Sequence, residues 1–439
     1  MKISKNYFRA IATMIGTIIG VGMFSVPFVI NQSGMYLFFA FIVIFGFVQY
    51  YMHLVYAEIF LSTKKRHRVP GYVQEYFGER FKKPALVIVL ISTNLTILSY
   101  LIIGGIFLNK LLSPVFGGTE FVYSVSMFFL AAILTFRGVK FIAKTELAMS
   151  AIFFMVIGII VFRGFPHIEP LNYQTIDWSN FFLPYGPIFM AIGGMTAIPT
   201  VCTLLSHKKE NIRSAIFWGT LIPIIITILF VVTVVGVSGS ATSPDSIVGL
   251  SGVLGNNVLL VSLIFGLVSI ITSLIIFVEA TREIYWWDLG IDKTHAWVFS
   301  LVIPFFLFLL GVNNLTTVVS LSGAVIGGIV SIIYIFLILK VKKNKQQESI
   351  ITVRINNQIA FGLIVLFILG FISVLEYVDI KTLGTISFVL FFYLYSLVKS
   401  DKHDSSIYFE LFETGKKTVY FFFLIFVLAL TFGVFSVVI

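Results

Sequence analysis

Long apolar runs alternate with short charged breaks along almost the whole chain. About thirteen of these runs reach or approach the roughly 20 residues that a helix needs to cross the hydrocarbon core of a bilayer. The predicted spans lie near residues 10–30, 35–61, 86–112, 121–137, 146–163, 183–205, 214–237, 257–281, 296–311, 315–340, 358–376, 381–398 and 419–438. The break near residues 378–382 is short, so a total of eleven or twelve spans also fits the C-terminal part.

The composition excludes a water-soluble globular protein. Of the 439 residues, 58% are hydrophobic and only 11% are charged, and the mean hydropathy is +1.02. A soluble domain carries roughly 25% charged residues. The first run is too long for a signal peptide and has no small-residue cleavage pattern, so we expect it to remain in the mature protein. These features predict an all-α, multi-pass protein of the plasma membrane.

The placement of basic residues predicts the orientation. If the N-terminus is cytoplasmic and the spans alternate, cytoplasmic segments hold all of the 30 Lys and Arg except Lys110, Arg163 and Lys381. This is the bias that the positive-inside rule describes, so we predict a cytoplasmic N-terminus. The basic residues then lie beside anionic lipid head groups, and we expect no nucleic-acid partner. A single cysteine, Cys202, cannot form an internal disulfide, and nothing in the sequence indicates a cofactor.

Two spans contain helix-breaking residues at membrane depth. The first reads GTIIGVGMFSVP over residues 16–27, and the sixth reads PYGPIFMAIGGMTAIP over residues 184–199. In a helix interior glycine costs about 1 kcal/mol and proline about 3 kcal/mol relative to alanine. The GxxxG spacing of Gly16 and Gly20 is also typical of close helix packing, and prolines kink membrane helices without any further role.

The positions of the two broken spans favour a functional interpretation. Spans one and six lead two consecutive sets of five, and interrupted helices at corresponding positions point to a transporter site in an inverted repeat. An unwound break exposes N–H groups that suit a carboxylate and C=O groups that suit an ammonium. We therefore expect an α-amino acid as the substrate.

The segment IGTIIGVGMFSVP, residues 15–27, resembles the first helix of the amino acid–polyamine–organocation transporters. Ile192, Gly193 and Gly194 followed by Pro199 resemble their sixth helix. Within this superfamily the chain looks most like the amino acid/auxin permeases and the bacterial aromatic amino acid permeases.

The resemblance covers residues 8–340 and implies a LeuT-like five-plus-five inverted-repeat core with broken helices one and six. The core would span residues 1–340, with repeats over about 8–163 and 181–340, and further C-terminal helices over 341–439. It also implies secondary active transport of L-amino acids by alternating access.

The resemblance implies a substrate site made of backbone groups at the two breaks. The carboxylate would meet amides of the first break, and the ammonium would meet carbonyls of both breaks. The amides are those of Val21, Gly22 and Met23; the carbonyls are those of Ile18 or Ile19, Phe189 and Ile192, with Gly193 in the same break.

Sodium-coupled relatives hold one sodium ion between first-helix carbonyls and eighth-helix hydroxyls. The matching residues here are Gly16, Ile19, Ser269, Thr272 and Ser273. Sodium accepts hard oxygen ligands, as other hard cations do, although Ser and Thr in membrane helices also bond to their own backbone. Some proton-coupled relatives carry a lysine in span five that replaces this sodium, and residues 147–162 contain none. Sodium is thus favoured and protons are the alternative.

Glu58 and Glu279 lie in or at the end of predicted spans, where ionisable residues are costly and are candidates for function. They could relay protons or gate the cytoplasmic exit, or instead pair with Arg282 and loop bases at the inner interface. The GVSG sequence at residues 236–239 matches a serine-protease turn, but no histidine base is expected nearby. We therefore predict no enzyme; a non-transporting amino acid receptor with the same fold is the other alternative.

Overall fold

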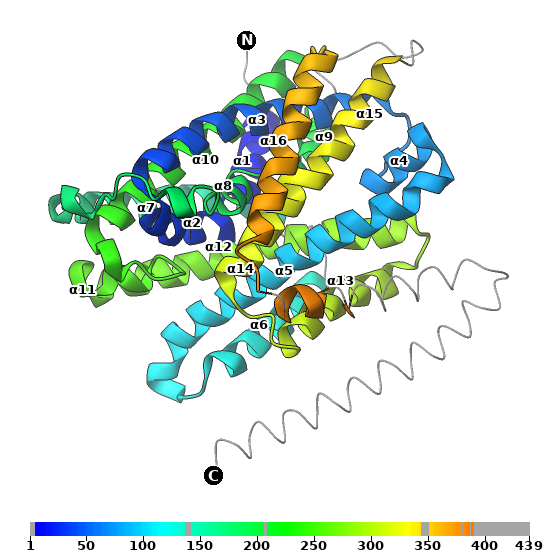
Figure 1. Ribbon diagram of the computed structural model, residues 1–439. Coiled ribbons are helices and arrows are strands. Elements are labelled where there is room, and N and C mark those ends of the chain that lie inside the picture. The colour runs from blue at the N-terminus through cyan, green and yellow to red at the C-terminus, as the bar shows by residue number, and fades with distance from the viewer. Residues whose placement is uncertain are drawn as a thin grey trace. The chain divides into compact units, whose positions relative to one another are not determined.

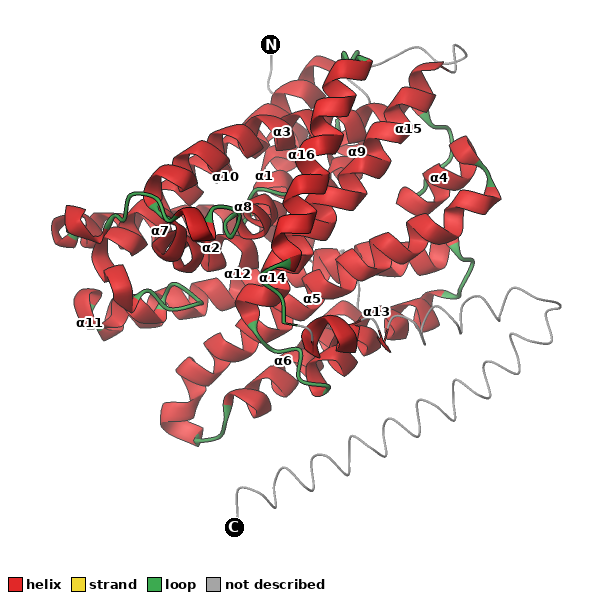
Figure 2. Ribbon diagram, viewed as in Figure 1, coloured by secondary structure: helices red, strands yellow, loops and turns green. Residues whose placement is uncertain are grey.

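The computed structural model describes residues 5–136, 142–205, 209–343, 351–379, 381–386 and 388–389, without the side chains of 142–151, 209 and 326. These residues fold into helices joined by short loops, and none of them is in a strand (Figures 1 and 2). Residues 1–383 belong to one compact unit, and the fold discussed below is that of this unit.

The helices match the first eleven predicted spans. Spans one and two are α1 (Lys5–Ile18) with α2 (Val21–Ser33), and α3 (Met35–Ser62). Spans three to seven are α5 (Glu79–Phe116), α6 (Glu120–Phe136), α7 (Ile142–Gly164), α8 (Tyr185–Ala191) with α9 (Ile198–Leu204), and α10 (Lys209–Ser238). Spans eight to eleven are α12 (Asn256–Glu283), α13 (Lys293–Leu309), α14 (Leu315–Ala324) with η9 (Val325–Val330) and α15 (Ser331–Lys343), and α16 (Asn357–Leu375). The predicted spans at 381–398 and 419–438 lie outside the described residues, except for 381–386 and 388–389.

The lengths and surfaces of these helices confirm a multi-pass membrane protein. Among the described residues, seven helices are long and apolar enough to cross a membrane, and the bent pair α1–α2 makes eight. Three shorter apolar helices lie at 120–136, 152–167 and 293–309. Large apolar side chains such as Phe47 and Phe162 are exposed, at 72% and 79% of their surface. A water-soluble protein would bury such side chains, but lipid tails solvate them.

Short elements that the apolar pattern did not predict lie at the ends of the spans. The helix α4 (Val69–Phe77) precedes α5 and packs against it and against α15. Gly78, with φ of +92°, allows the sharp turn from α4 into α5. A π-helical segment, η8 (Ile284–Asp288), follows α12, and the η9 segment within span ten is also π-helical.

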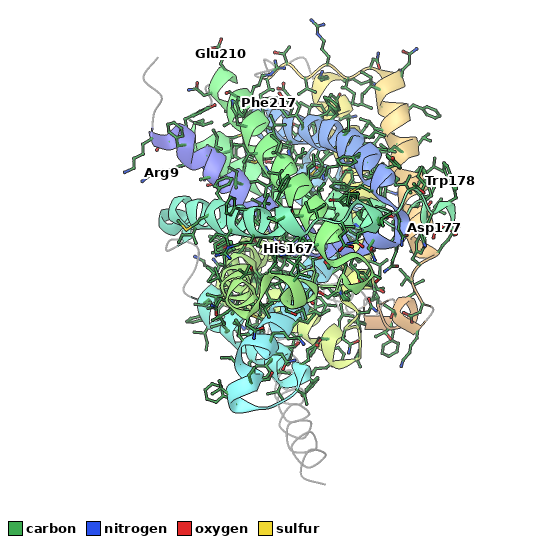
Figure 3. All side chains as sticks on the ribbon, turned by 90° about the vertical axis from the view of Figure 1, so that its left-hand side faces the viewer. Arg9, His167, Asp177, Trp178, Glu210 and Phe217 are labelled. Atoms are coloured by element: carbon green, nitrogen blue, oxygen red, sulfur yellow. The ribbon has the colours of Figure 1, made fainter. Side chains whose placement is uncertain are left out.

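The segments predicted to face opposite sides of the membrane are well separated. In Figure 3, Arg9 and Glu210 from predicted cytoplasmic segments lie at the upper left of the bundle. Asp177 and Trp178, from the predicted outer segment between α7 and α8, lie at its right-hand side.

Two sets of helices pack among themselves, and α7 and α14 pack against both sets. The broken spans pack against each other and against α3 and α10, while α5 packs against α6, α12 and α13 (Figure 1). The helix α14 crosses α8 so closely that a Cβ atom on Gly323 would lie 1.9 Å from the Gly186 carbonyl oxygen. Small residues at this crossing therefore hold the outer half of span six against span ten.

Candidate functional site

The break in span one separates α1 from α2, whose axes are bent by 48°. Gly20 lies between them in an extended conformation, with φ of −161° and ψ of −150°. The Ile19 amide still donates to the Ile15 carbonyl at 2.9 Å, and the Met23 amide donates to the Gly20 carbonyl at 3.2 Å. Because the first N–H groups of a helix have no partner within it, the start of α2 presents the amides of Val21 and Gly22 at the break. Met23 uses its amide within the first turn.

The break in span six separates α8 from α9. The amide of Ile192 donates to Ile188 at 3.2 Å, that of Gly193 donates to Met190 at 3.3 Å, and the chain then leaves the helix. The 3₁₀ turn η5 (Met195–Ala197) leads into α9. Gly194 lies outside both helices; its carbonyl accepts from the Ala197 amide of the turn at 3.1 Å, and its amide needs a partner from another segment.

The two breaks lie against each other. A Cβ atom on Gly22 would lie 2.5 Å from the Ala191 nitrogen and 2.6 Å from its Cα. A Cβ atom on Gly194 would lie 2.7 Å from the Ile18 side chain. Glycine at position 22 allows the two backbones to approach this closely, and glycine at position 194 leaves room for the Ile18 side chain. Ile18 and Gly22 of the predicted substrate site thus contact Gly194 and Ala191, which are neighbours in sequence of the predicted residues Ile192 and Gly193.

Hydroxyl groups of α12 face the end of α1, as the resemblance to sodium-coupled transporters implies. The Ser273 hydroxyl donates to the carbonyls of Gly16 at 3.1 Å and Ile19 at 3.2 Å, and the Ser269 hydroxyl lies 3.2 Å from the Ile19 oxygen. Thr272 is the exception, because its hydroxyl donates to the Ser269 carbonyl of its own helix at 2.9 Å. Four of the five predicted ion ligands therefore meet here, and the Thr272 side chain lies apart from them.

Tyr100 of α5 lies against the first break, and no pattern in the sequence identifies it. Its hydroxyl interacts with the Val21 backbone and with the Ser273 side chain. A Cβ atom on Gly20 would lie 2.3 Å from the same hydroxyl oxygen. Tyr100 therefore links the start of α2 to the hydroxyls of α12.

Two polar side chains of α3 hold the second break. The Gln49 amide nitrogen donates to the Phe189 carbonyl at 3.1 Å, and its amide oxygen is buried with no hydrogen-bond partner among the described residues. One turn later, His53 Nε2 accepts from the Gly194 amide at 2.9 Å. The sequence signal for this pair is two polar residues spaced i, i+4 within an apolar run, which places them on one helix face.

Aromatic rings surround the outer side of the second break. The Phe189 ring stacks on Tyr185 at 5.9 Å and meets Phe45 and Phe367 edge-on at 5.4 and 5.8 Å. The π-helical turn in span ten brings Gly327 close to it, since a Cβ atom there would lie 2.5 Å from the Phe189 ring. These rings form an aromatic wall beside the backbone groups of the break.

Glu58 contacts a backbone segment on the cytoplasmic side. Its buried carboxylate accepts from the amides of Ile351 at 2.6 Å and Thr352 at 3.1 Å. Ile351 is itself fully buried, so the segment that precedes α16 is anchored to the inner half of α3. This contact gives Glu58 a structural partner.

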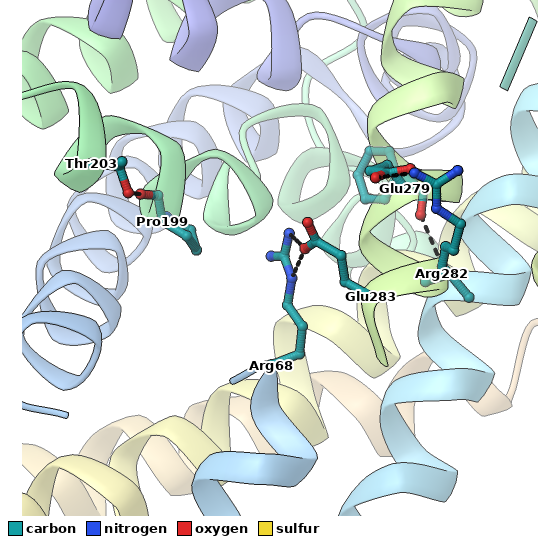
Figure 4. Close-up of polar contacts among 8 residues, drawn as sticks. Arg68, Pro199, Thr203, Glu279, Arg282 and Glu283 are labelled. Carbon is teal, nitrogen blue, oxygen red and sulfur yellow. Dashed lines mark hydrogen bonds and ion pairs between the residues drawn. The ribbon is translucent and has the colours of Figure 1, made fainter. Parts of the chain in front are cut away.

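Acidic groups at the end of α12 pair with basic side chains (Figure 4). Glu279 pairs with Arg282 one turn later. Glu283 binds Arg68, which precedes α4, through Nε at 2.8 Å and Nη2 at 2.6 Å. Burial alone would lower the pKa of Arg68, but the Glu283 carboxylate outweighs it and holds that pKa above its ordinary value. The Arg68–Glu283 pair thus ties the segment after span two to the end of span eight.

Ser238, in the GVSG sequence, ends α10 and donates to the Val234 carbonyl of its own helix. This bond is the ordinary one for a serine at a helix end and gives the residue no arrangement of a nucleophile.

The geometry is that of two broken membrane helices whose breaks meet, with backbone groups and hydroxyls gathered around them. A search of curated proteins finds no match for the chain. The model of the tryptophan/tyrosine permease family matches residues 3–379, which is most of the sequence. The chain belongs to the tryptophan/tyrosine permease family and is a multi-pass membrane transporter of amino acids.

Proposed function

We propose that the protein carries an aromatic L-amino acid, tryptophan or tyrosine, across the plasma membrane by secondary active transport. The family supports an aromatic substrate. The observation that carries the proposal is the contact of the two breaks at Gly22 and Ala191. Irregular backbone at membrane depth is tolerated where it lines a cavity or is covered by protein, so breaks that meet are a suitable place for a polar substrate.

The substrate's charged groups would bind to backbone groups. The amides of Val21 and Gly22 at the positive end of α2 suit the carboxylate, which would share the Val21 backbone with the Tyr100 hydroxyl. The carbonyls of Ile18, Ile19, Phe189 and Ile192 suit the ammonium, and the Phe189 oxygen keeps a second lone pair beside its bond from Gln49. The substrate ring would pack along the aromatic wall beside Phe189, where offset or edge-on ring pairs are favourable.

The transport cycle would use a LeuT-like inverted repeat over residues 1–340, with the helices of 341–439 outside the core. The two contact sets support this division: the broken spans with α3 and α10 would move against α5, α6, α12 and α13. Each break belongs to the first set, and α12 supplies hydroxyls from the second set. Relative movement of the sets would therefore open and close the site on alternate sides.

For the coupling ion, the hydroxyl–carbonyl cluster at Gly16, Ile19, Ser269 and Ser273 supports sodium. A cation between these oxygens would join the two contact sets and so favour one conformation. For a proton gradient, Glu58 and Glu279 are the acidic candidates, and both already have partners, in backbone amides and in Arg282.

Uptake into proteoliposomes tests the proposal. Radiolabelled L-tryptophan, L-tyrosine and a panel of non-aromatic L-amino acids are offered with a sodium gradient or a proton gradient imposed separately. We expect concentrative uptake of an aromatic amino acid, with non-aromatic amino acids at least tenfold slower. Uptake of a non-aromatic amino acid in preference would refute the substrate proposal, and binding without uptake under either gradient would indicate a receptor.

A further inference from the structure

His53 bridges the break in span six and the middle of span seven. The side chain is fully buried in α3. Its Nε2 atom accepts from the Gly194 amide at 2.9 Å, and its Nδ1 atom lies 2.9 Å from the Thr220 hydroxyl oxygen of α10. Each contact joins segments more than 140 residues apart in the sequence. The segments that they join, α3, α10 and the break in span six, all belong to the set of helices that carries the breaks.

The two contacts fix the protonation state of this imidazole. An amide N–H can only donate, so Nε2 must offer a lone pair to Gly194. A neutral imidazole has one acceptor and one donor nitrogen, so Nδ1 carries the proton and donates to the Thr220 oxygen. A second proton, on Nε2, would place two N–H groups against each other. The observed geometry of the second break thus exists only with neutral His53.

The surroundings of His53 offer no charge that would stabilise an imidazolium in this conformation. On its own helix, Glu58 lies five residues later and is bound by the amides of Ile351 and Thr352. The other titratable side chains on α3 and on the elements packed against it are Tyr36, Tyr50, Tyr51, Tyr56, Tyr185, Cys202, Lys209, Glu210, Arg213, Tyr334, Lys340, Lys342 and Lys343. Among the described residues, His53 forms hydrogen bonds with Gly194 and Thr220 and no ion pair.

We propose that His53 binds a proton during the transport cycle, in a conformation in which it has released the Gly194 amide. The proposal rests on the proposed transport function and holds whichever ion gradient drives uptake. Gly194 follows the predicted ammonium-binding carbonyls and contacts Ile18 of the first break. Its release would therefore change the backbone around the substrate, so that proton binding at His53 and substrate binding influence each other.

The size of the effect follows from ordinary histidine titration. An imidazole that has left its buried site and reached water titrates near pH 6.5. Lowering the pH from 8 to 5 then raises the population of the released conformation by about 30-fold relative to that of the conformation with neutral His53. A shift of this size changes any transport step or affinity that depends on the balance between the two conformations.

Substrate counterflow at matched internal and external pH tests the proposal, because it needs no ion gradient. Proteoliposomes loaded with unlabelled L-tryptophan exchange it for radiolabelled L-tryptophan at pH values from 5 to 8. We expect the wild-type rate to change at least fivefold over this range. In His53→Gln, an amide oxygen still accepts from Gly194 but cannot be protonated, so the rate should vary less than twofold.

His167→Gln is the matched control, because His167 is exposed in the predicted outer segment after α7 and its hydrogen bond among the described residues is to the Arg163 carbonyl (Figure 3). It should keep the wild-type pH profile. If His53→Gln does not fold, His53→Asn supplies a second side chain that cannot be protonated.

A wild-type rate that stays constant from pH 5 to pH 8, or a His53 variant that keeps the wild-type profile, overturns the proposal. If the wild-type protein shows no counterflow at all, the transport proposal fails separately. The same pH series measured by binding of radiolabelled L-tryptophan then decides the role of His53, and absence of binding or of pH dependence overturns it.

Discussion

Replacing Gly22 by alanine tests whether the close contact between the two breaks is needed for transport. The new Cβ atom would lie 2.5 Å from the Ala191 nitrogen, 2.6 Å from its Cα and 2.8 Å from the Met190 carbonyl carbon. All three atoms belong to the backbone, so no change of side-chain rotamer relieves the overlap. The two broken spans must move apart until these contacts exceed 3.0 Å.

The expected loss of uptake follows from two opposing free-energy contributions. Alanine is favoured over glycine in a helix by up to about 1 kcal/mol, which helps α2 to form. Overpacking of a close contact costs about 1–3 kcal/mol, and this cost falls on the conformation in which the breaks touch. The protein should therefore fold, while uptake should fall by about 5- to 150-fold, the factor that corresponds to the overpacking cost.

The assay is initial uptake of radiolabelled L-tryptophan by equal amounts of reconstituted protein. Gly362→Ala is the control, because the same substitution in α16 places a Cβ atom with nothing within 4 Å. Gel filtration of both variants checks that each is folded. If Gly22→Ala transports as well as Gly362→Ala, contact between the breaks is not required and the site proposed here is wrong.

Three further predictions concern single contacts. Ser273→Ala removes the hydroxyl that contacts Gly16 and Ile19, so half-maximal uptake should need at least tenfold more sodium than in the wild type. Thr272→Ala should behave like the wild type, because this hydroxyl bonds to its own helix. Equal sodium dependence of the two variants would count against the ion site. Arg68→Gln and Glu283→Gln should each lower the melting temperature in detergent, because each change leaves one largely buried charge unpaired. The double variant should lower the melting temperature by less than the sum of the two single decreases. Strictly additive decreases would argue against the pair. Asp245 lies in the predicted outer loop between α10 and α12, and burial raises the pKa of its carboxyl above the ordinary value. The folded state therefore binds this proton more tightly than the unfolded chain does. The stability that results is fully present below the ordinary pKa and is lost as pH rises through the raised pKa. Asp245→Asn should therefore raise the melting temperature at pH 7 and reduce its acid-range pH dependence, while Asp245→Ala, which removes the acceptor for the amides of Ile247 and Val248, should lower it.

The spans and their breaks could be predicted because both depend on local composition. A run of about 20 apolar residues has few alternatives to a membrane helix. Glycine and proline weaken such a helix wherever it packs, so residues 16–27 and 184–199 identified the breaks before any contact was known. The short helix α4 escaped prediction because its nine residues are far fewer than a membrane span needs, so length and hydropathy did not identify it.

The choice among the hydroxyls of α12 needed the structure. Ser269 and Ser273 are four residues apart and share a face, whereas Thr272 is turned about 100° from Ser273. Any of the three satisfies the spacing of the resemblance, and only the packing of α12 against α1 decides which of them face Gly16 and Ile19. The partner of Glu58 was equally hidden, because the amides of Ile351 and Thr352 are almost 300 residues away in the sequence.

Polar side chains and helix breaks in this protein satisfy each other. A regular membrane helix uses its backbone groups internally, so a buried polar side chain finds few backbone partners outside its own helix. A broken helix supplies such partners and needs them as well. Gln49 and His53 of α3 bind Phe189 and Gly194 at the second break, and Ser273 of α12 binds Gly16 and Ile19 at the first. In an apolar sequence, a pair of polar residues on one helix face is therefore a reason to look for a break elsewhere, and a break is a reason to look for such a pair. Gln49 and His53 fit that rule, and the structure shows that they serve the break in span six.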